Sequence, residues 1–475
     1  MTKQHTKITI VGAGLAGSVL AVYFAKRGLS VDVYEHRPDM RQSSTTAGRS
    51  INLALSKRGI HALREVGLLD AIMDMAIPMR GRLIHATDGT LTFQRYGKDD
   101  SEVIYSVSRG ELNRKLIDLA EAHSNVRLHF QMRCDGIDTT KHQLRVTDER
   151  TGKSHSISGQ PVVATDGAGS AVRTSMEQHG LVKVSSELLE HGYKELTIPA
   201  SEAGGFALDP HALHIWPRKS FMLIALPNPD ASFTCTLFLR HEGTPGFSSL
   251  NTADSIRSFF DSEFPDASAL MPTLEKDFLT NPVGILGTIR CFPWHLDGSI
   301  ALLGDACHAI VPFFGQGMNC AFEDCTVLND CLDEYGYDWT RIFRIWEKRR
   351  KVNADAIADL ALENFVEMRD HVADPQFLLT KQIGLELERR FPEYFIPKYS
   401  MVTFHRTPYA VALRRGIIQT DILRTLAVGI SSAEQVDYAL AGRLLRERLR
   451  PYSGEAVPEH EATADPPNPP SRTPR

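Results

Sequence analysis

The chain has 475 residues, which is too long for one simple hydrophobic core and predicts about two or three domains. Its hydrophobic fraction of 42% and charged fraction of 23% are ordinary for a soluble globular protein. A net charge of -5 provides no basic surface for nucleic acid, so we expect no nucleic-acid partner.

The chain begins with the pattern of a strand, a glycine turn, a helix and a second strand. Residues 8–11 are an apolar strand, residues 17–26 a helix that Gly28 ends, and residues 31–35 a second strand. This order predicts one βαβ unit of a doubly wound sheet.

Three glycines at the spacing GxGxxG follow the first strand. Gly12 permits a tight turn, Gly14 lets the backbone approach a phosphate, and Gly17 lets the helix pack closely on the strand. The free N–H groups around Leu15 and Ala16, together with the helix dipole, favour an anion. The turn therefore predicts a pyrophosphate site.

An acidic residue ends the second strand. Glu35 lies about 20 residues after the turn, where a carboxylate binds ribose hydroxyls, and His36 and Arg37 follow in a position to edge the adenine. In this context we favour a dinucleotide site over a chance match. The motif alone does not separate NAD from FAD.

Two features in the next part of the chain favour FAD. Arg109 opens a helix over residues 112–122, from which it would reach the pyrophosphate; a strand over residues 126–130 follows. A short strand over residues 162–165 ends at Asp166 in a polar, glycine-rich turn. In isolation we would interpret Arg109 as a solvated arginine at a helix start, and the glycine-rich turn alone could be any loop.

The third feature is a late strand that ends in a carboxylate. Residues 299–303 form a buried strand that delivers Asp305 at its carboxyl end, where open α/β sheets bind ligands. A helix then starts at Gly317, Met318 and Asn319, with its positive end toward the flavin pyrimidine edge. A capping aspartate is the alternative, but the three features together favour FAD.

The remaining segments differ in periodicity. Residues 213–216, 220–226 and 232–239 alternate like the strands of an inserted antiparallel sheet. After residue 315 the chain is mostly helical, with helical periodicity over 337–370 and two further helices within 414–448.

The sequence therefore predicts an α/β fold with a doubly wound, Rossmann-type FAD-binding domain, an inserted antiparallel-sheet substrate domain and a C-terminal helical region. The predicted boundaries are 1–185 and 285–335 for the FAD-binding domain (with an inserted hairpin near 80–97), 186–284 for the substrate domain, 336–450 for the helical region and 451–475 for a disordered, proline-rich tail.

The order of the GxGxxG turn, the Asp-Gly turn and the Gly-Asp strand end resembles the group A flavoprotein aromatic hydroxylases. Segments 48–56, 79–85, 311–319 and 363–369 are similar to the branch of that family that hydroxylates L-kynurenine to 3-hydroxykynurenine in tryptophan degradation. The likeness extends from residue 7 to about residue 450. It implies Ala54 and Cys134 as further FAD contacts.

The resemblance also implies the chemistry. NADPH reduces the FAD without a second Rossmann domain, and O2 then gives a flavin C4a-hydroperoxide that attacks the ring carbon activated by the aniline nitrogen. The protein need only exclude water and position the ring, so we expect no catalytic residue beyond the flavin and positioning residues, and no metal.

The substrate site follows from the same resemblance. Arg82 matches the position that binds the substrate carboxylate, with Tyr96, Asn364 and Tyr399 beside it. Both tyrosines are otherwise ordinary half-buried core residues. Asn364 lies in an apolar helical stripe, so its amide makes either a buried structural bond or a ligand contact, and we favour the ligand contact. The expected apolar wall is Met222, Ile224, Leu226, Phe238, Pro312, Phe313, Phe314 and Met368.

One feature of the predicted hairpin conflicts with this site. A two-residue turn at Asp88 and Gly89 pairs Arg82 with Arg95 and places Tyr96 on the other face. Both side chains reach one ligand only if the hairpin has a bulge or a longer loop. We therefore predict such an irregularity.

Alternatives remain at this stage. A group A hydroxylase for another aromatic carboxylic acid has the same motifs, as does a non-catalytic flavin-binding relative; a flavin halogenase would need a tryptophan-rich motif that is absent. No apolar run reaches the length of a membrane span, and the seven cysteines suit neither zinc nor a disulfide framework. We expect a cytoplasmic, bacterial-type protein without a membrane anchor, with a homodimer as one expectation for its assembly.

Overall fold

The computed structural model describes residues 7–42, 52–141, 143–158, 161–371 and 374–452. The predicted disordered tail lies outside the described residues from position 453 onward.

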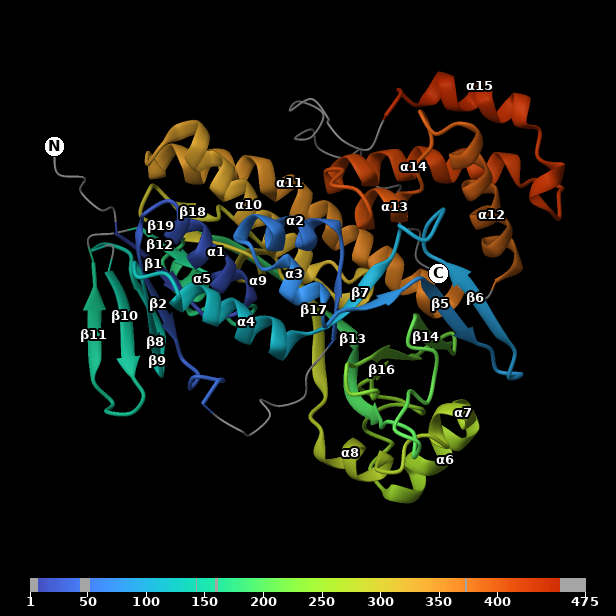
Figure 1. Ribbon diagram of the computed structural model, residues 1–475, viewed down its shortest axis with the longest axis horizontal. Coiled ribbons are helices and arrows are strands. Elements are labelled where there is room, and N and C mark those ends of the chain that lie inside the picture. Colours follow the sequence, from blue (N-terminus) through green and yellow to red (C-terminus); the bar gives the residue numbers. More distant parts are fainter. Residues whose placement is uncertain (1–6, 43–51, 142, 159–160, 372–373, 453–475) are drawn as a thin grey trace.

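A six-stranded sheet forms the nucleotide-binding half of the molecule, in the order β18-β19-β12-β1-β2-β8 (Figure 1). Neighbouring strands are parallel except for β18 and β19. The parallel, doubly wound sheet predicted from the sequence is therefore confirmed, and the late strand β19 lies beside β12. The strands are β1 (Lys7–Val11), β2 (Ser30–Glu35), β8 (Val126–Phe130), β12 (Val162–Ala164), β18 (His295–Leu296) and β19 (Ile300–Leu302).

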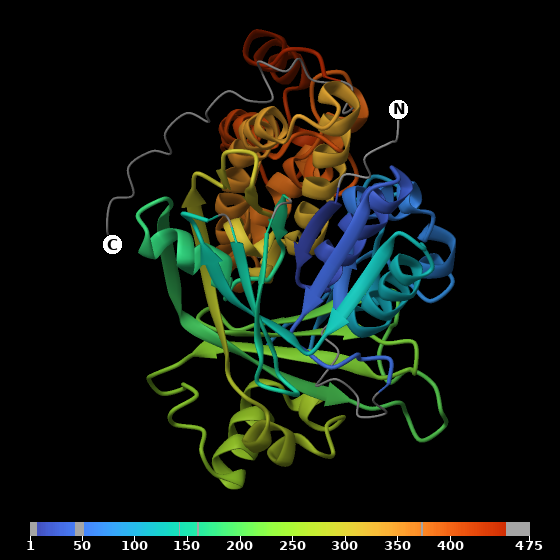
Figure 2. The same cartoon turned by 90° about the vertical axis from the view of Figure 1, so that its left-hand side faces the viewer.

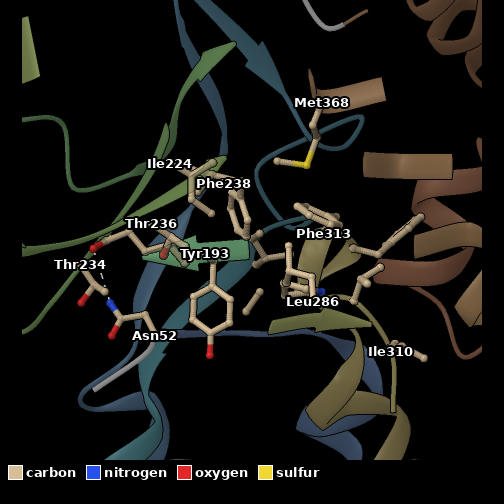
Figure 3. Close-up of a pocket in the computed structure, with 18 of the residues that line it drawn as sticks. Asn52, Tyr193, Ile224, Thr234, Thr236, Phe238, Leu286, Ile310, Phe313 and Met368 are labelled. Carbon is tan, nitrogen blue, oxygen red and sulfur yellow. Dashed lines mark hydrogen bonds between the residues drawn. The ribbon is translucent and has the colours of Figure 1, made fainter. Parts of the chain in front are cut away.

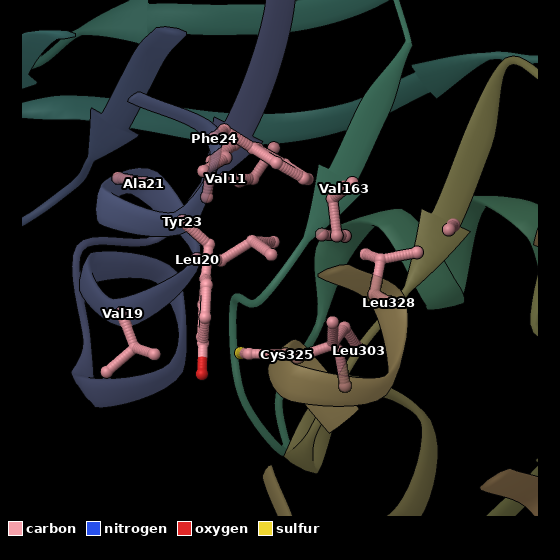
Figure 4. Close-up of a cluster of buried hydrophobic side chains, with 14 of the residues drawn as sticks. Val11, Val19, Leu20, Ala21, Tyr23, Phe24, Val163, Leu303, Cys325 and Leu328 are labelled. Carbon is pink, nitrogen blue, oxygen red and sulfur yellow. The ribbon is translucent and has the colours of Figure 1, made fainter. Parts of the chain in front are cut away.

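Helices bury the apolar side chains of this sheet. Leu20 and Phe24 of the first helix pack with Cys325 and Leu328 of a late helix and with Val163 of the sheet, all fully buried (Figure 4). Strands covered on both faces are expected to be largely apolar, as β12 and β19 at the centre of this sheet are. The helices of this half are α1 (Leu15–Lys26), α2 (Lys57–Val66), α3 (Leu69–Met73), α4 (Arg109–Glu121), α5 (Ala171–Gln178), α9 (Asp305–His308) and α10 (Gly317–Tyr335).

Two three-stranded sheets flank this half, in the orders β11-β10-β9 and β3-β7-β4. Their strands are β3 (Asn52–Leu55), β4 (Ile77–Met79), β7 (Ile104–Ser108), β9 (Met132–Asp138), β10 (Gln143–Asp148) and β11 (Ser154–Ile157).

A seven-stranded sheet in the order β17-β13-β16-β15-β14-β5-β6 forms the second layer. Figure 2 shows helices α6–α8 on one side of it, and the nucleotide-binding sheet and the C-terminal helices on the other. Its strands and helices are β5 (Gly81–His85), β6 (Leu91–Arg95), β13 (Lys183–Ile198), β14 (Ala212–Pro217), β15 (Met222–Pro227), β16 (Phe233–Arg240), β17 (Gly284–Phe292), α6 (Ala253–Glu263), α7 (Pro265–Ser268) and α8 (Leu274–Thr280).

The β5–β6 hairpin belongs to this sheet, whereas the sequence analysis places it in the FAD-binding domain. The reason is that the backbone groups of β5 find partners on β14, which runs parallel to it. Arg82 is thus attached to the sheet of the substrate domain.

The C-terminal region is helical, as predicted. The predicted helix over 337–370 is a helix of 28 residues followed by one π-helical turn, and the predicted pair within 414–448 begins earlier, at Tyr409. Among the described residues, no helix has the length and apolar composition needed to cross a bilayer. The elements are η1 (Pro312–Phe314), α11 (Trp339–Val366), η2 (Glu367–His371), α12 (Pro375–Arg390), α13 (Lys398–Thr403), α14 (Tyr409–Leu426), η3 (Ala433–Gln435) and α15 (Tyr438–Arg448).

Candidate active site

The glycine turn after β1 has the geometry that its sequence predicts. Gly12 has a φ of +95°, and a Cβ there would lie 2.8 Å from the carbonyl oxygen of Thr165. A Cβ on Gly17 would lie 2.0 Å from the Gly12 carbonyl oxygen, so only glycine lets α1 pack this closely. A Cβ on Gly14 would meet no atom within 4 Å. The space before the N-terminus of α1, around Leu15 and Ala16, is therefore open to a ligand.

Glu35 lies beside this turn at the end of β2. Its carboxylate accepts hydrogen bonds from the Ala13 N–H at 2.8 Å and from Arg37 Nε at 2.8 Å, and His36 Nδ1 is 3.1 Å away. Burial acts to raise the pKa of Glu35, but the hydrogen bonds and charge of Arg37 hold it below its usual range. An ionised acceptor is thus placed next to the turn.

Two buried oxygen atoms near the turn have no partner in the part of the chain that the structure describes. Asp166 caps α5 with Oδ2, which accepts from Ala171 N at 2.9 Å, while its Oδ1 is unpaired. Asn113 donates from Nδ2 to the Ala13 carbonyl at 3.3 Å, and its Oδ1 is also unpaired. Burial, with the nearby Asp166 charge, raises the pKa of the Cys134 thiol to about 12. The orphaned oxygens suit a ligand that carries hydroxyl groups.

Asn113 is a candidate that the sequence analysis missed. It lies one helical turn after Arg109 on α4, and this spacing was a usable signal. Arg109 itself is exposed, and its positive charge acts on Asp305 and on the Tyr193 hydroxyl.

The late segment lies across from the glycine turn. Asp305 follows Gly304, whose φ is +66°, and lines a cavity to which it is exposed; desolvation by the protein around this cavity raises the pKa of Asp305. Cys320 makes the first backbone hydrogen bond of α10, to the Gln316 carbonyl, so the N–H groups of Gly317 and Met318 precede the helical ladder.

The side chain of Asn319 is occupied by the protein itself. Its Oδ1 accepts from the Ser56 N–H at 3.0 Å, and its Nδ2 donates to the carbonyls of Ala54 at 2.8 Å and Gly315 at 2.9 Å. Asn319 therefore fixes β3 and the glycine-rich loop, and only its backbone N–H group is directed to the open end of the helix.

A cavity of about 400 Å³ lies between the two sheets and the end of α11 (Figure 3). This volume is in the range of small-molecule sites. Most of the predicted substrate residues line it, namely Arg82, Tyr96, Ile224, Leu226, Phe238, Pro312, Phe313, Phe314, Met368 and Tyr399. The predicted cofactor residues Ala54 and Asp305 line it as well.

Met222 and Asn364 are predicted substrate residues that do not line this cavity. Met222 is fully buried in the core beneath it. Asn364 donates from Nδ2 to the Phe313 carbonyl at 2.7 Å and lies 3.3 Å from the Met368 sulfur. The structural alternative for Asn364 therefore fits its contacts, because the amide holds Phe313 in the cavity wall.

Arg82 forms the charged part of the cavity wall. Its guanidinium lies 5.7 Å from the Tyr96 ring and 5.3 Å from the Tyr399 ring, and Nη1 donates to Glu367 at 3.1 Å. Nε is buried and has no partner among the described residues. Burial disfavours its charge, but Glu367 and the tyrosines keep the pKa of Arg82 above its usual value. Arg82 is therefore a charged hydrogen-bond donor whose Nε–H group is available to a ligand.

A second cation lies near this pair. Burial, and then the charge of Arg82, lower the pKa of Lys381 on α12 to about 8, and its Nζ lies 3.4 Å from Gln94 Oε1. Lys381 of the C-terminal region thus reaches the β5–β6 hairpin beside Arg82.

The irregularity predicted for the hairpin is confirmed. Residue pairing across β5 and β6 places Arg82 opposite Gln94, and the Ala86 N–H donates to the Thr90 carbonyl, which leaves a three-residue loop at 87–89. The register moves by one residue relative to a two-residue turn. Tyr96 then shares the face of Gln94 and Arg82, because side chains alternate along a strand.

Several polar lining residues were missed by the sequence analysis. Thr234 and Thr236 lie on the cavity side of β16 together with the predicted Phe238, and Tyr193 of β13 lies beside Phe238 (Figure 3). Asn52 donates to the Pro227 carbonyl at 2.7 Å, and its Oδ1 is buried without a partner among the residues described. The period-two pattern of β16 was a usable signal for the threonines, and the resemblance of segment 48–56 was one for Asn52.

Fold and site together define a protein of the flavoprotein class, with a parallel sheet whose first strand is followed by a glycine turn suited to a dinucleotide and an aromatic cavity lined by Ala54 and Asp305. Residues 5–335 match the family described as FAD binding domain, and the chain belongs to that family. The 2-methyl-3-hydroxypyridine-5-carboxylic acid oxygenase has a similar fold, with a TM-score of 0.63 at 19% identity over 80% of this chain and 96% of that one. PqsL of P. aeruginosa, solved in complex with 2-aminobenzoylacetate, also has a TM-score of 0.63 at 19% identity, over 77% of this chain and 97% of that one.

Curated relatives specify the group more narrowly. The chain is 50% identical to the kynurenine 3-monooxygenase of Myxococcus xanthus (strain DK1622) over 94% of this chain and 96% of that protein. It is 46% identical to the kynurenine 3-monooxygenase of Xanthomonas axonopodis pv. citri (strain 306) over 95% of this chain and 99% of that protein. The chain therefore belongs to the kynurenine 3-monooxygenase family.

Proposed function

We propose that this chain is an FAD-dependent monooxygenase that consumes NADPH and O2 to hydroxylate L-kynurenine to 3-hydroxykynurenine. The observation that supports this substrate best is the pairing of Arg82 with Glu367 at an aromatic cavity. An α-amino acid has both an anionic and a cationic end, and this pair offers a partner to each. A simple aromatic acid has a carboxylate but no ammonium group, so it would need only the cation, Arg82.

The residues fit FAD at three places. The open space at Gly14 would receive the pyrophosphate, and Glu35 would accept from a ribose hydroxyl. Asp166, with its unpaired Oδ1, and Asp305 would face the rest of the dinucleotide. The start of α10 at Gly317 would face the flavin pyrimidine edge. When bound, FAD supplies the redox chemistry with NADPH and O2, and the protein positions the substrate and excludes water.

The cavity residues would hold the aromatic ring of the substrate next to the bound FAD. Arg82 binds the carboxylate between the rings of Tyr96 and Tyr399, and Phe238 and Phe313 lie 4.8 Å apart in the apolar wall. The buried wall excludes water, which protects the reactive oxygen species from hydrolysis and other side reactions.

The cysteines support the expected location in the cytoplasm. All seven are free thiols, and six of them are buried. A reducing compartment maintains cysteines in this state.

The test is NADPH consumption by the purified holoprotein with and without L-kynurenine, with the product identified by mass. Stimulation by kynurenine and a product heavier by one oxygen atom would support the proposal. Stimulation only by phenolic acids would instead favour a hydroxylase for another aromatic acid. Bound FAD without stimulated NADPH oxidation would indicate a non-catalytic relative.

A further inference from the structure

A tyrosine of the C-terminal region reaches the loop that starts α10. Tyr409 is the first residue of α14 and is fully buried, and its hydroxyl donates to Gln316 Oε1 at 2.8 Å. We propose that Tyr409 is a positioning residue that fixes the start of α10 through Gln316, and that it thereby raises the reduction potential of bound FAD. The proposal rests on the proposed FAD binding and not on the identity of the substrate.

Gln316 is held from two sides directly before the open end of the helix. Its Nε2 donates to Ser56 Oγ at 3.2 Å, while its Oε1 accepts from Tyr409. The side chain is 2% exposed, so loss of either partner leaves a buried amide atom unsatisfied. Its backbone carbonyl accepts the first helical hydrogen bond of α10, from Cys320. The orientation of Gln316 therefore sets the orientation of the first turn.

Tyr409 is itself held by a buried arginine. The guanidinium of Arg58, on α2, lies 3.8 Å from the centre of the Tyr409 ring. Arg58 also donates to the carbonyls of Val402 and Thr407, and from Nε to Glu323 of α10 at 3.0 Å. The phenol cannot turn away from Gln316 without breaking this stack.

The electrostatic consequence follows from the helix dipole. The N–H groups at the start of α10 present partial positive charge, which stabilises an anion most when donors and anion are well aligned. Reduced flavin has more negative charge at its pyrimidine edge than oxidised flavin. A less fixed helix start therefore weakens binding of reduced FAD more than binding of oxidised FAD.

The test is an anaerobic redox titration of the holoprotein carrying Tyr409→Phe, without NADPH or kynurenine. The variant keeps the ring that stacks on Arg58 and loses the hydrogen bond to Gln316. We expect binding of reduced FAD, relative to oxidised FAD, to weaken about tenfold, which for a two-electron couple is a fall of about 30 mV.

Tyr452→Phe is the matched control. The Tyr452 hydroxyl is also buried and donates to Thr407 Oγ1 at 2.7 Å, in the same network but without contact to Gln316. We expect this control to have the potential of the unmodified protein. Equal potentials in the Tyr409→Phe and Tyr452→Phe proteins would overturn the proposal.

Gln316→Met provides an independent test in the same redox titration. This variant should lower the reduction potential of bound FAD as Tyr409→Phe does. The double variant should have no lower potential than either single variant, because both changes remove the same hydrogen bond between Tyr409 and Gln316. Additive shifts, or an unchanged potential in Gln316→Met, would contradict the proposal even if the Tyr409 variant failed to retain FAD. A colourless unmodified protein would instead refute FAD binding. If the reduction potentials shift as expected but the protein does not turn over kynurenine, only the proposal that L-kynurenine is the substrate is refuted.

Discussion

Replacement of Arg82 by methionine tests the substrate assignment most directly. The change approximately conserves side-chain volume and removes every N–H donor from a side chain that is only 4% exposed. Hydrogen bonds to charged groups contribute about 1.5–3 kcal/mol each. Two such bonds to the carboxylate, less the desolvation of both ions, give a loss of about 2–4 kcal/mol. This corresponds to roughly a 30- to 1,000-fold decrease in kcat/KM for L-kynurenine.

The assay is steady-state NADPH oxidation with the hydroxylated product quantified. FAD content should not change, because Arg82 lies on the substrate-domain sheet and away from the glycine turn. Kynuramine, which is kynurenine without its carboxylate, should be used almost equally well by the variant and the unmodified protein.

Arg95→Met is the matched control for this variant. Arg95 lies on the same hairpin but is exposed, and it pairs with exposed Asp100. We expect a change in kcat/KM of less than about twofold, since surface ion pairs contribute little. An unchanged KM for kynurenine in Arg82→Met, or an equal loss with kynuramine, would refute carboxylate recognition by Arg82.

Three further predictions concern the cofactor site and stability. Gly14→Ala should weaken FAD binding about 10- to 100-fold in calorimetric titration and leave apoprotein melting unchanged, whereas Gly17→Ala should prevent folding because its Cβ meets backbone. Glu388 has its pKa raised by burial from 4.5 to about 7, so its charge costs stability as pH rises through that range. Glu388→Gln should therefore be more stable than the unmodified protein by about 2–3 kcal/mol near pH 8 and no more stable near pH 4. Glu386→Gln should show no gain near pH 8, because hydrogen bonds from Arg389 hold the pKa of half-buried Glu386 below its usual range. Arg58→Met should lower the free energy of urea unfolding by about 3–5 kcal/mol, because the carbonyls of Val402 and Thr407 lose a charged donor and Glu323 keeps only Arg350; a loss below about 1 kcal/mol would contradict this.

The nucleotide-binding half was predictable because its constraints are local. The positions of Gly12, Gly14 and Gly17 depend on steric limits that act over a few residues, and Glu35 follows at the end of the next strand. The central strands of a parallel sheet also leave a clear signal, since β12 and β19 are apolar throughout.

The substrate side was only partly predictable because its contacts join distant segments. The conflict between Arg82 and Tyr96 in a two-residue turn predicted the longer hairpin loop. The pairing of Arg82 with Glu367 depends on the π-helical turn at the end of α11, which no local pattern indicates. For Asn364 the periodicity predicted burial but could not identify the Phe313 carbonyl as its partner.

The position of β19 also has a consequence for biosynthesis. This strand pairs with β12 inside the nucleotide-binding sheet, and Asp305 and α10 follow it, so the complete cradle includes residues from both ends of a long stretch of chain. A nascent polypeptide that has left the ribosome only as far as β16 has the glycine turn but lacks the strand that completes the crevice. We therefore expect FAD to bind only after β19 and α10 have been synthesised, so that chains terminated before them lack both flavin and the stability that a bound ligand confers on the native state.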